Sequence, residues 1–302
     1  LGPDGLSHLK SLVLELAENP VPVPPEDEHE VVGWGSGGKT YAHEMAERSR
    51  QSTVRMALMD IADAEGDVDA FIGQYDAKTR KVPAIAAEIA ERQLAAGRVE
   101  DAWGFIERAE VRDQGWVPSE WQAVRLDVLE ALGRNDEAQA FRLECFHLDL
   151  ASDHLRAYIK RLPDFDDVEA EDEAMTYALT YPSALSALHF LIHWPALDRA
   201  AQLVISRADE MDGNHYEILT PTADALAANH PLAATLALRA MIDFALGAAR
   251  SKRYRHAARH LLECESLAGQ IEDFGNIEQH VTYVANLKAK HGRKQSFWGH
   301  LA

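Results

Sequence analysis

The stretch AAGRVEDA, residues 95–102, returns 36 positions later as ALGRNDEA, residues 131–138, and apolar helical runs flank both copies. In each copy the glycine favours the left-handed conformation that ends a helix, and the acids after it suit the positive end of the next helix. The alanine five places after the glycine is small enough to let two helices touch. Each copy therefore predicts a helix, a turn and a second helix.

A repeat of this length is typical of tetratricopeptide-like hairpins, which stack into a solenoid because no single hairpin buries its own apolar face. Degenerate turns of the same kind are predicted after Gly66, at Trp194-Pro195 and at Arg253-Tyr254. We therefore predict an all-α fold, specifically an α-α superhelix of tetratricopeptide-like helical hairpins.

The first part of the chain has a different composition. A helix with an apolar stripe is predicted over residues 6–18, and prolines, acids and then glycines follow it. Proline imposes extended geometry and glycine loosens the chain, so residues 19–38 are predicted to form a linker or mobile loop. The predicted regions are an N-terminal helix plus linker over 1–38 and a helical-repeat solenoid with a basic C-terminal end over 39–302.

Acidic residues dominate the composition. Forty-nine Asp and Glu against thirty Lys and Arg give a net charge of −19, which opposes general binding to nucleic acid or to an anionic membrane. Residues 239–302 are the exception, with ten basic and six acidic side chains, a local balance of +4. The basic end is therefore the predicted place for an anion.

Cysteine usage and hydropathy bear on the compartment. Cys145 and Cys264 are too few for a disulfide framework or a four-cysteine metal site, which fits a reducing environment. No apolar run is long enough to span a bilayer, and His8, Lys10 and Glu15 interrupt the first helix, unlike a signal peptide. We predict a cytoplasmic protein that is not bound to membranes.

Four phrases carry a resemblance to a known family: ADAEGDVDAFI (62–72), RLPDFDDVEAE (161–171), a long phrase beginning PLAATLALRAM (231–264) and HGRKQSFW (291–298). They resemble an uncharacterised bacterial family of helical-repeat proteins, classed as a domain of unknown function, some members of which occur beside SWIM-type zinc-finger proteins. The resemblance covers nearly the whole chain but implies no activity. A SWIM motif needs Cys-x-Cys, which this chain lacks.

Residues Gly33–Thr40, GWGSGGKT, match the phosphate-loop pattern G-x-x-x-x-G-K-[ST]. In that reading, Lys39 would reach the terminal phosphates and Thr40 would bind magnesium. A phosphate loop follows a buried strand of a parallel sheet, whereas here four acids and only two valines precede it. A flexible glycine-rich loop is the favoured interpretation, with nucleotide binding as an alternative.

Two other clusters have ordinary structural explanations. His256, His260 and Cys264 share one helical face, but the outer two are about 12 Å apart along a helix, too far to share one ion. Residues 164–173 contain seven acids and lack the glycine and glutamate of a calcium loop. These acids suit the start of a helix, with a docking surface for a basic partner as the alternative. We predict no metal and no cofactor.

The basic cluster is the predicted binding site for an anion or a partner. Its cations come from one turn and from the final helix and tail, with two aromatic rings as candidate stacking platforms. Cations that compensate helix carboxyl ends are the alternative explanation. The candidate residues are Arg250, Lys252, Arg253, Tyr254, Arg255, Arg259, Lys290, Arg293, Lys294 and Trp298.

No nucleophile, base and orienting group occur at a recognisable spacing, so binding is favoured over catalysis. The leading hypothesis is a non-enzymatic scaffold or adaptor that binds a protein or peptide. The second is binding of an anionic ligand, a nucleic acid or a phosphorylated metabolite, at the C-terminal basic surface. The third is a nucleotide-binding protein that uses Gly33–Thr40.

Overall fold

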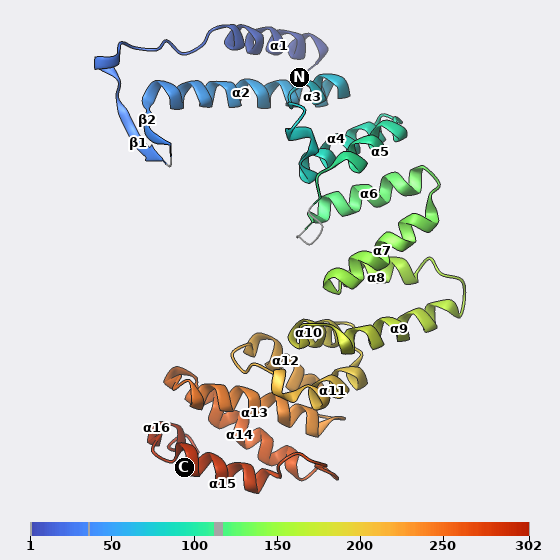
Figure 1. The fold of residues 1–302 in the computed structure, drawn as a ribbon, viewed down its shortest axis with the longest axis vertical. Helices are drawn as coiled ribbons and strands as arrows, with labels where there is room; N and C mark the ends of the chain where they lie inside the picture. The colour runs from blue at the N-terminus through green and yellow to red at the C-terminus, as the bar shows by residue number, and fades with distance from the viewer. Residues whose placement is uncertain (1, 36, 112–116, 302) are drawn as a thin grey trace. The chain divides into compact units, whose positions relative to one another are not determined.

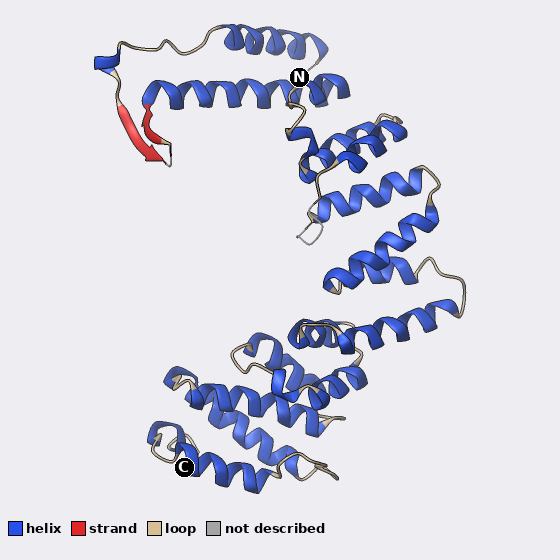
Figure 2. Cartoon of the chain, viewed as in Figure 1, coloured by secondary structure: helices blue, strands red, loops and turns tan. Residues whose placement is uncertain are grey.

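A computed structural model describes residues 2–35, 37–111 and 117–301, and most of these residues are helical (Figures 1 and 2). The chain divides into two compact units, residues 1–141 and 142–302, and the division falls inside helix α7. The prediction of a mostly helical protein is confirmed. The stacking of residues 39–302 into one solenoid stays a prediction.

The first unit contains seven α-helices among its described residues, with α7 continuing past the division, together with two short 3₁₀ turns and one hairpin. The elements are α1 (Pro3–Glu18), η1 (Glu26–Glu28), β1 (Val31–Gly35), β2 (Gly38–Tyr41), α2 (Ala42–Glu65), α3 (Val68–Gly73), η2 (Thr79–Lys81), α4 (Pro83–Ala95), α5 (Val99–Arg108), α6 (Ser119–Ala131) and α7 (Asn135–Asp149).

The two sequence repeats form the predicted hairpins, α4–α5 and α6–α7. Gly97 and Gly133 both take the left-handed conformation, with φ of 75° and 71°. In both turns the N–H that follows the glycine donates to the carbonyl four residues before the glycine, at 2.8 and 2.9 Å, which closes the helix end. Ala102 and Ala138 are fully buried. The predicted helix, turn and second helix are therefore confirmed for each copy of the repeat.

Helix α1 is held to α2 by a polar contact. Arg50 of α2 donates through Nη1 to the carbonyls of Leu16 and Ala17, at 2.6 and 3.1 Å, where α1 ends. Its Nε and Nη2 pair with the carboxylate of Glu47, which also accepts the N–H of Val21 at 2.9 Å. Arg50 therefore supplies a cation to the negative end of α1 and fixes the chain that leaves it.

The predicted loop over 19–38 is wrong for its last part. Strands β1 and β2 pair antiparallel, with Trp34 opposite Lys39. Gly38 takes a φ of 112°, which gives the chain the reversal that a tight hairpin needs, and Ala42 N–H donates to Glu30 O at 2.9 Å and extends the pairing. The glycines therefore serve a turn between strands.

The second unit is built from helices in its described residues. They are α8 (Ser152–Ile159), α9 (Asp166–Thr180), α10 (Ala184–His193), α11 (Leu197–Ser206), η3 (Ala208–Glu210), α12 (Tyr216–Leu226), α13 (Pro231–Gly247), η4 (Ser251–Arg253), α14 (Tyr254–Ala268), α15 (His280–His291) and α16 (Gln295–Trp298). No helix in the described part of either unit combines the length and apolar character needed to cross a membrane.

Helix α13 runs through the core of the second unit. Ten of its seventeen residues are buried, among them Leu238, Ile242 and Leu246. Helix α14 packs along it and contributes Ala257 and Leu261 to the same core (Figure 1). Helix α12 lies against α13 as well. These three helices position the candidate site.

Candidate functional site

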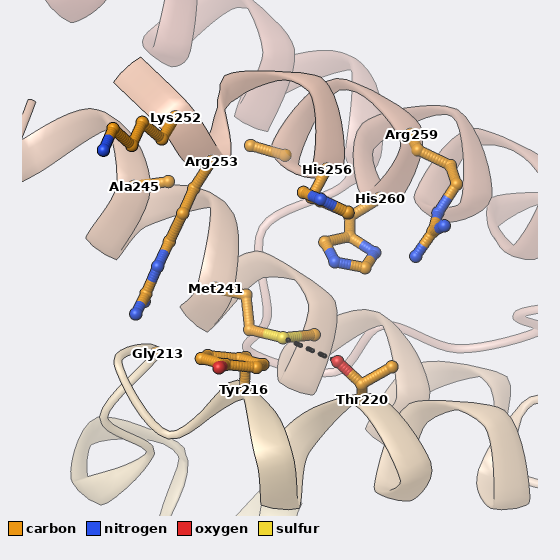
Figure 3. A pocket seen from close by; sticks show the side chains of 11 residues that line it. Gly213, Tyr216, Thr220, Met241, Ala245, Lys252, Arg253, His256, Arg259 and His260 are labelled. Carbon is orange, nitrogen blue, oxygen red and sulfur yellow. Dashed lines mark hydrogen bonds between the residues drawn. The ribbon is translucent and has the colours of Figure 1, made fainter. Parts of the chain in front are cut away.

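A cavity of about 450 Å³ lies between α12, α13 and α14 (Figure 3). Its walls are mostly carbon, and basic side chains and histidines stand at its edges. The lining residues are Gly213, Tyr216, Thr220, Met241, Ala245, Lys252, Arg253, His256, Ala257, Arg259 and His260. The size lies within the usual range for small-molecule sites, roughly 300–1,000 Å³.

The turn between α13 and α14 brings two cations to this cavity. Ala249 takes the left-handed conformation with a φ of 51°, and Arg250 N–H donates to Ala245 O at 2.9 Å. These are the bonds made at Gly97 and Gly133, with alanine in the glycine's place. The 3₁₀ turn that follows presents Lys252 and Arg253 to the cavity.

Sequence reasoning missed this turn. It predicted a turn at Arg253-Tyr254, but the structure reverses the chain at Ala249 and begins α14 at Tyr254. Alanine carries no turn signal because its Cβ disfavours a positive φ. Aligning the buried Ala258 with Ala102 and counting back five places leads to Arg253, so the spacing of the repeat points to the wrong turn here.

Arg253 lies between two aromatic rings. Its guanidinium carbon is 4.8 Å from the ring centroid of Tyr216 and 5.3 Å from that of Phe244. Nη1 donates to Asn214 O at 3.4 Å, and no carboxylate of the described residues lies within ion-pair distance of Arg253 or Lys252. Figure 3 shows the guanidinium reaching toward Tyr216. Lys252 is exposed, and Arg253 reaches a carboxyl only from a distance, helping to lower the pKa of Glu217. The hydrogen-bond donors of Arg253 therefore remain available to an anion from outside.

The other end of the cavity has its charge neutralised. Arg259 Nε lies 3.2 Å from Glu263 Oε1, and His260 Nδ1 lies 2.9 Å from Oε2 of the same carboxylate. The Thr220 hydroxyl donates to Met241 Sδ at 3.5 Å, below the histidine (Figure 3). The cavity is therefore polarised, with its available positive charge at the Lys252–Arg253 end.

The predicted stacking platforms have structural roles. Tyr254 is buried against Phe297, with ring centroids 6.1 Å apart, and its hydroxyl accepts a hydrogen bond from Lys294 Nζ at 3.1 Å. Trp298 Nε1 donates to His291 O at 3.0 Å. The tail therefore meets the start of α14, and Tyr254 offers no ring to solvent.

The remaining cations of the predicted cluster lie apart from the cavity. Arg250, Arg255, Lys290 and Arg293 are exposed, and none of them lines it. Of the ten predicted residues the structure thus gathers Lys252, Arg253 and Arg259 around one cavity. A role for the exposed four in binding a partner stays a prediction.

The other half of the cavity could not be read from the sequence. Tyr216, Thr220 and Met241 carry no motif. Tyr216 and Thr220 lie on α12, well before the basic turn in sequence, whereas Met241 lies on α13, which leads into that turn. Phe244, which flanks Arg253, resembles any other aromatic residue of an apolar helix. Their role arises only where α12 and α13 meet α14.

The histidines and Cys264 do not converge on an ion. Cys264 is buried with Sγ directed at Thr235 O, 3.9 Å away, and burial raises the pKa of its thiol to about 12. His260 pairs with Glu263, and His256 lines the cavity. Within the described ranges no three His, Cys, Asp or Glu side chains are arranged to hold a metal ion.

The phosphate-loop pattern falls on the β1–β2 hairpin. Gly33 pairs with Thr40, and Lys39 Nζ lies 5.7 Å from the ring of Trp34. A phosphate loop instead runs from a strand of a parallel sheet into a helix and turns its N–H groups inward. The local geometry does not favour a phosphate cradle, and nucleotide binding stays an untested alternative.

The acids of 164–173 serve partly as structural partners within the second unit. Glu171 accepts from Trp194 Nε1 at 2.6 Å, and Asp172 pairs with Arg199 at 2.6 Å. Between and beside the acids, Phe165 and Val168 are 86% and 68% exposed. The start of α9 therefore combines negative charge with apolar side chains in solvent.

Comparison with known proteins places the chain in a family. The family model DUF6880, described as a family of unknown function, matches residues 1–300, so the chain belongs to this family. No curated protein and no solved structure matches the chain. The predicted resemblance to a domain of unknown function over nearly the whole chain is thereby confirmed.

Proposed function

We propose that this protein binds rather than catalyses, and that its C-terminal unit holds a small ligand with an apolar body and one acidic group. The observation that carries the proposal is the cavity between α12, α13 and α14, which is walled mostly by carbon and bears unpaired Lys252 and Arg253 at one end. The apolar body would lie against Met241 and Ala245, and the acidic group beside Arg253.

Electrostatics support an anion at this end. A buried or half-buried arginine normally acquires a carboxylate partner, and several others in this unit have one, such as Arg199 with Asp172 and Arg207 with Glu210. Arg253 instead stacks on Tyr216 and Phe244, which hold its guanidinium in place while leaving its hydrogen-bond donors largely unused.

The proposed fold is a tetratricopeptide-like solenoid of the kind predicted for a bacterial helical-repeat family. Three hairpins support it, because α4–α5, α6–α7 and α13–α14 close with the same pair of backbone bonds at Gly97, Gly133 and Ala249. Stacked hairpins of this kind create extended concave surfaces that such proteins use for binding. An association with SWIM proteins stays a prediction of the resemblance.

Titration with 1-anilinonaphthalene-8-sulfonate tests the proposal, because this probe joins an aromatic body to a single sulfonate. We expect saturable binding by the full chain that weakens as salt is added. Arg253→Ala should weaken it about tenfold, as the loss of a hydrogen bond to a charged group does. The matched control is Arg255→Ala, which removes an exposed cation two residues away.

Equal affinity of the two variants would show that the probe binds elsewhere and would sink the proposal. Far-UV circular dichroism and melting of each variant separate lost binding from lost folding. A long-chain carboxylate should displace the probe from the wild type, because it offers the same combination of charge and apolar surface.

A second candidate function is that of an adaptor for a protein or peptide. It is favoured by the start of α9, where exposed Phe165 and Val168 lie among seven acids and suit a partner segment that is both basic and apolar. Capture from the native host by wild type and by Phe165→Ser tests it, with Val281→Ser as a control that changes another exposed apolar residue of the same unit. A partner retained equally by both variants would refute this surface.

A further inference from the structure

A second cavity, of about 520 Å³, lies along α13 and is independent of the first proposal. Its walls are α13, residues 208–213 and residues 276–283. The charged and polar side chains that line it are Asp212, Arg239, Asp243, Asn276, Glu278 and Tyr283. Neither the sequence motifs nor the function proposed above uses this cavity.

Arg239 is the unusual member of this lining. It is only 6% exposed, yet no carboxylate of the described chain lies within ion-pair distance of it. Nη1 donates to Glu278 O at 2.7 Å, while Nε and Nη2 are buried without a hydrogen-bond partner. Buried polar groups are almost always paired, and an unpaired charged one needs an explanation.

The two unpaired nitrogen atoms form one edge of the guanidinium. The N–H groups of Nε and Nη2 point in parallel, at the spacing of the two oxygens of a carboxylate, which is the side-on bidentate geometry. The bond from Nη1 to Glu278 and the Tyr283 ring, 4.3 Å from the guanidinium carbon, fix the plane of this edge. Arg239 is thus already oriented for a carboxylate.

Negative charge lies in the same cavity, one helical turn away. Asp243 Oδ1 accepts the hydroxyl of Tyr283 at 2.9 Å. Burial raises the pKa of this carboxyl by disfavouring its charged form, which an ammonium group beside it would stabilise. Asp212 lines the cavity too. A doubly charged phosphate would meet these acids, whereas a ligand that carries an ammonium group together with its carboxylate would match both signs.

We propose that this cavity binds a small zwitterion of the amino-acid type, with its carboxylate on the Nε/Nη2 edge of Arg239 and its ammonium facing Asp243. Because that edge is buried, part of the cavity wall must shift to admit the ligand, and we assign this shift to Asn276 and Ile277, which leaves the Glu278 carbonyl bonded to Nη1 of Arg239. This segment lies between α14 and α15, outside both helices, where a shift breaks few backbone hydrogen bonds.

Isothermal titration of the full chain with each of the twenty amino acids tests the proposal, with acetate and methylammonium as probes of one charge each. We expect at least one amino acid to bind and to raise the melting temperature, and neither single-charge probe to do so at equal concentration. Arg239→Lys keeps the positive charge but loses the two parallel N–H donors of the guanidinium edge, and it should weaken binding at least tenfold. Exposed Arg255→Lys is the control and should bind as the wild type does.

Asp243→Asn supplies a second readout, which holds even if Arg239→Lys does not fold. The amide still accepts the Tyr283 hydroxyl but removes the charge, so affinity for the amino acid should fall toward that for acetate. Absence of binding by any amino acid at about 10 mM, a concentration that detects complexes of roughly 3 kcal/mol or stronger, would overturn the proposal. Unchanged affinity in both variants would overturn it as well. Arg253→Ala should leave this binding intact, which separates the two cavities.

Discussion

Helices α2 and α13 belong to different units and are stabilised in opposite ways. Helix α2 has 24 residues and buries only Ile61 and Ala62, whereas α13 has 17 and buries ten. Polar contacts help to secure α2, with Arg50 in its first half bonded to the end of α1 and Asp63 near its last residue paired with Arg92 of α4 at 2.6 Å. Apolar burial secures α13 against its neighbours.

The comparison teaches where each unit can tolerate change. A helix with little buried surface depends on a few specific hydrogen bonds for its position. Substitutions at its exposed positions should therefore change stability little, whereas substitutions of the residues that make those bonds should lower it. A helix buried on most sides tolerates little anywhere, because each side chain fills space that its neighbours cannot refill. It is in the tightly packed unit that both cavities and their fixed side chains occur.

The largest effect should follow from emptying the core around α13. Leu246→Ala should lower the free energy of unfolding by about 2–5 kcal/mol, because Leu246 is completely buried and its loss leaves a cavity. Met56→Ala on exposed α2 should change it by less than about 0.5 kcal/mol. Urea unfolding followed by circular dichroism measures both. Similar losses in the two variants would remove the contrast between the helices.

A smaller effect should follow from adding one methyl group to a glycine in each unit. At Gly213 a Cβ would lie 1.9 Å from Ala240 O, so Gly213→Ala should cost about 1–3 kcal/mol through overpacking. At Gly73, the last residue of α3, nothing lies within 4 Å and φ is not positive. Gly73→Ala should be neutral or stabilise by up to about 1 kcal/mol.

Thermal melting of the two glycine variants gives the comparison directly. Equal melting temperatures would show that the loop at Gly213 yields without cost. They would also mean that the wall of both cavities near this residue is not rigid.

A local effect should follow from removing the hydrogen bonds between Arg50 and the end of α1. Arg50→Ala removes both hydrogen bonds to the end of α1 and the pairing with Glu47, so amide hydrogen exchange should quicken in α1 and stay unchanged in α13. Arg48→Ala, an exposed neighbour, is the control. Unaltered exchange in α1 would mean that apolar contacts alone hold it.

The smallest expected effect is that of low pH on the contact between Glu47 and Arg50. Arg50 and the N–H of Val21 lower the pKa of Glu47 from 4.5 to about 2. A carboxyl whose pKa is lower in the folded state stabilises fully above its unfolded value and loses that contribution as pH falls toward the folded one. The first unit should therefore lose melting temperature between pH 5 and about 2, and Glu47→Gln should lose less across the same interval.

The helices and hairpins were largely predictable from the sequence, because their signals are local. Gly97 and Gly133 indicate turns because glycine adopts the left-handed conformation more easily than other residues. Pro83 and Pro231 indicate helix starts. The hairpin at Trp34 was missed because clustered glycines are as typical of loose loops as of tight turns. The turn at Ala249 carried no signal at all.

The candidate site was predictable only in part. The sequence pointed to the basic end and to Arg253, since ten cations among 64 residues stand out in a chain of net charge −19. It wrongly assigned Tyr254 a solvent role, because exposure depends on what packs against a ring, and Phe297 comes from a different helix. The buried Arg239 looked like one more cation among ten.

By itself the sequence determined the helical class, the positions of several turns and the distribution of charge, with an acidic chain and a basic C-terminal end. These features follow from the composition and from local turn chemistry, which depend on few or no long-range contacts. Tertiary structure alone decided which cations stay unpaired. Arg253 meets Tyr216 and Arg239 meets Glu278 across 37 and 39 positions of chain, and only helix packing sets such distances. The binding chemistry that we propose therefore depends on contacts between helices.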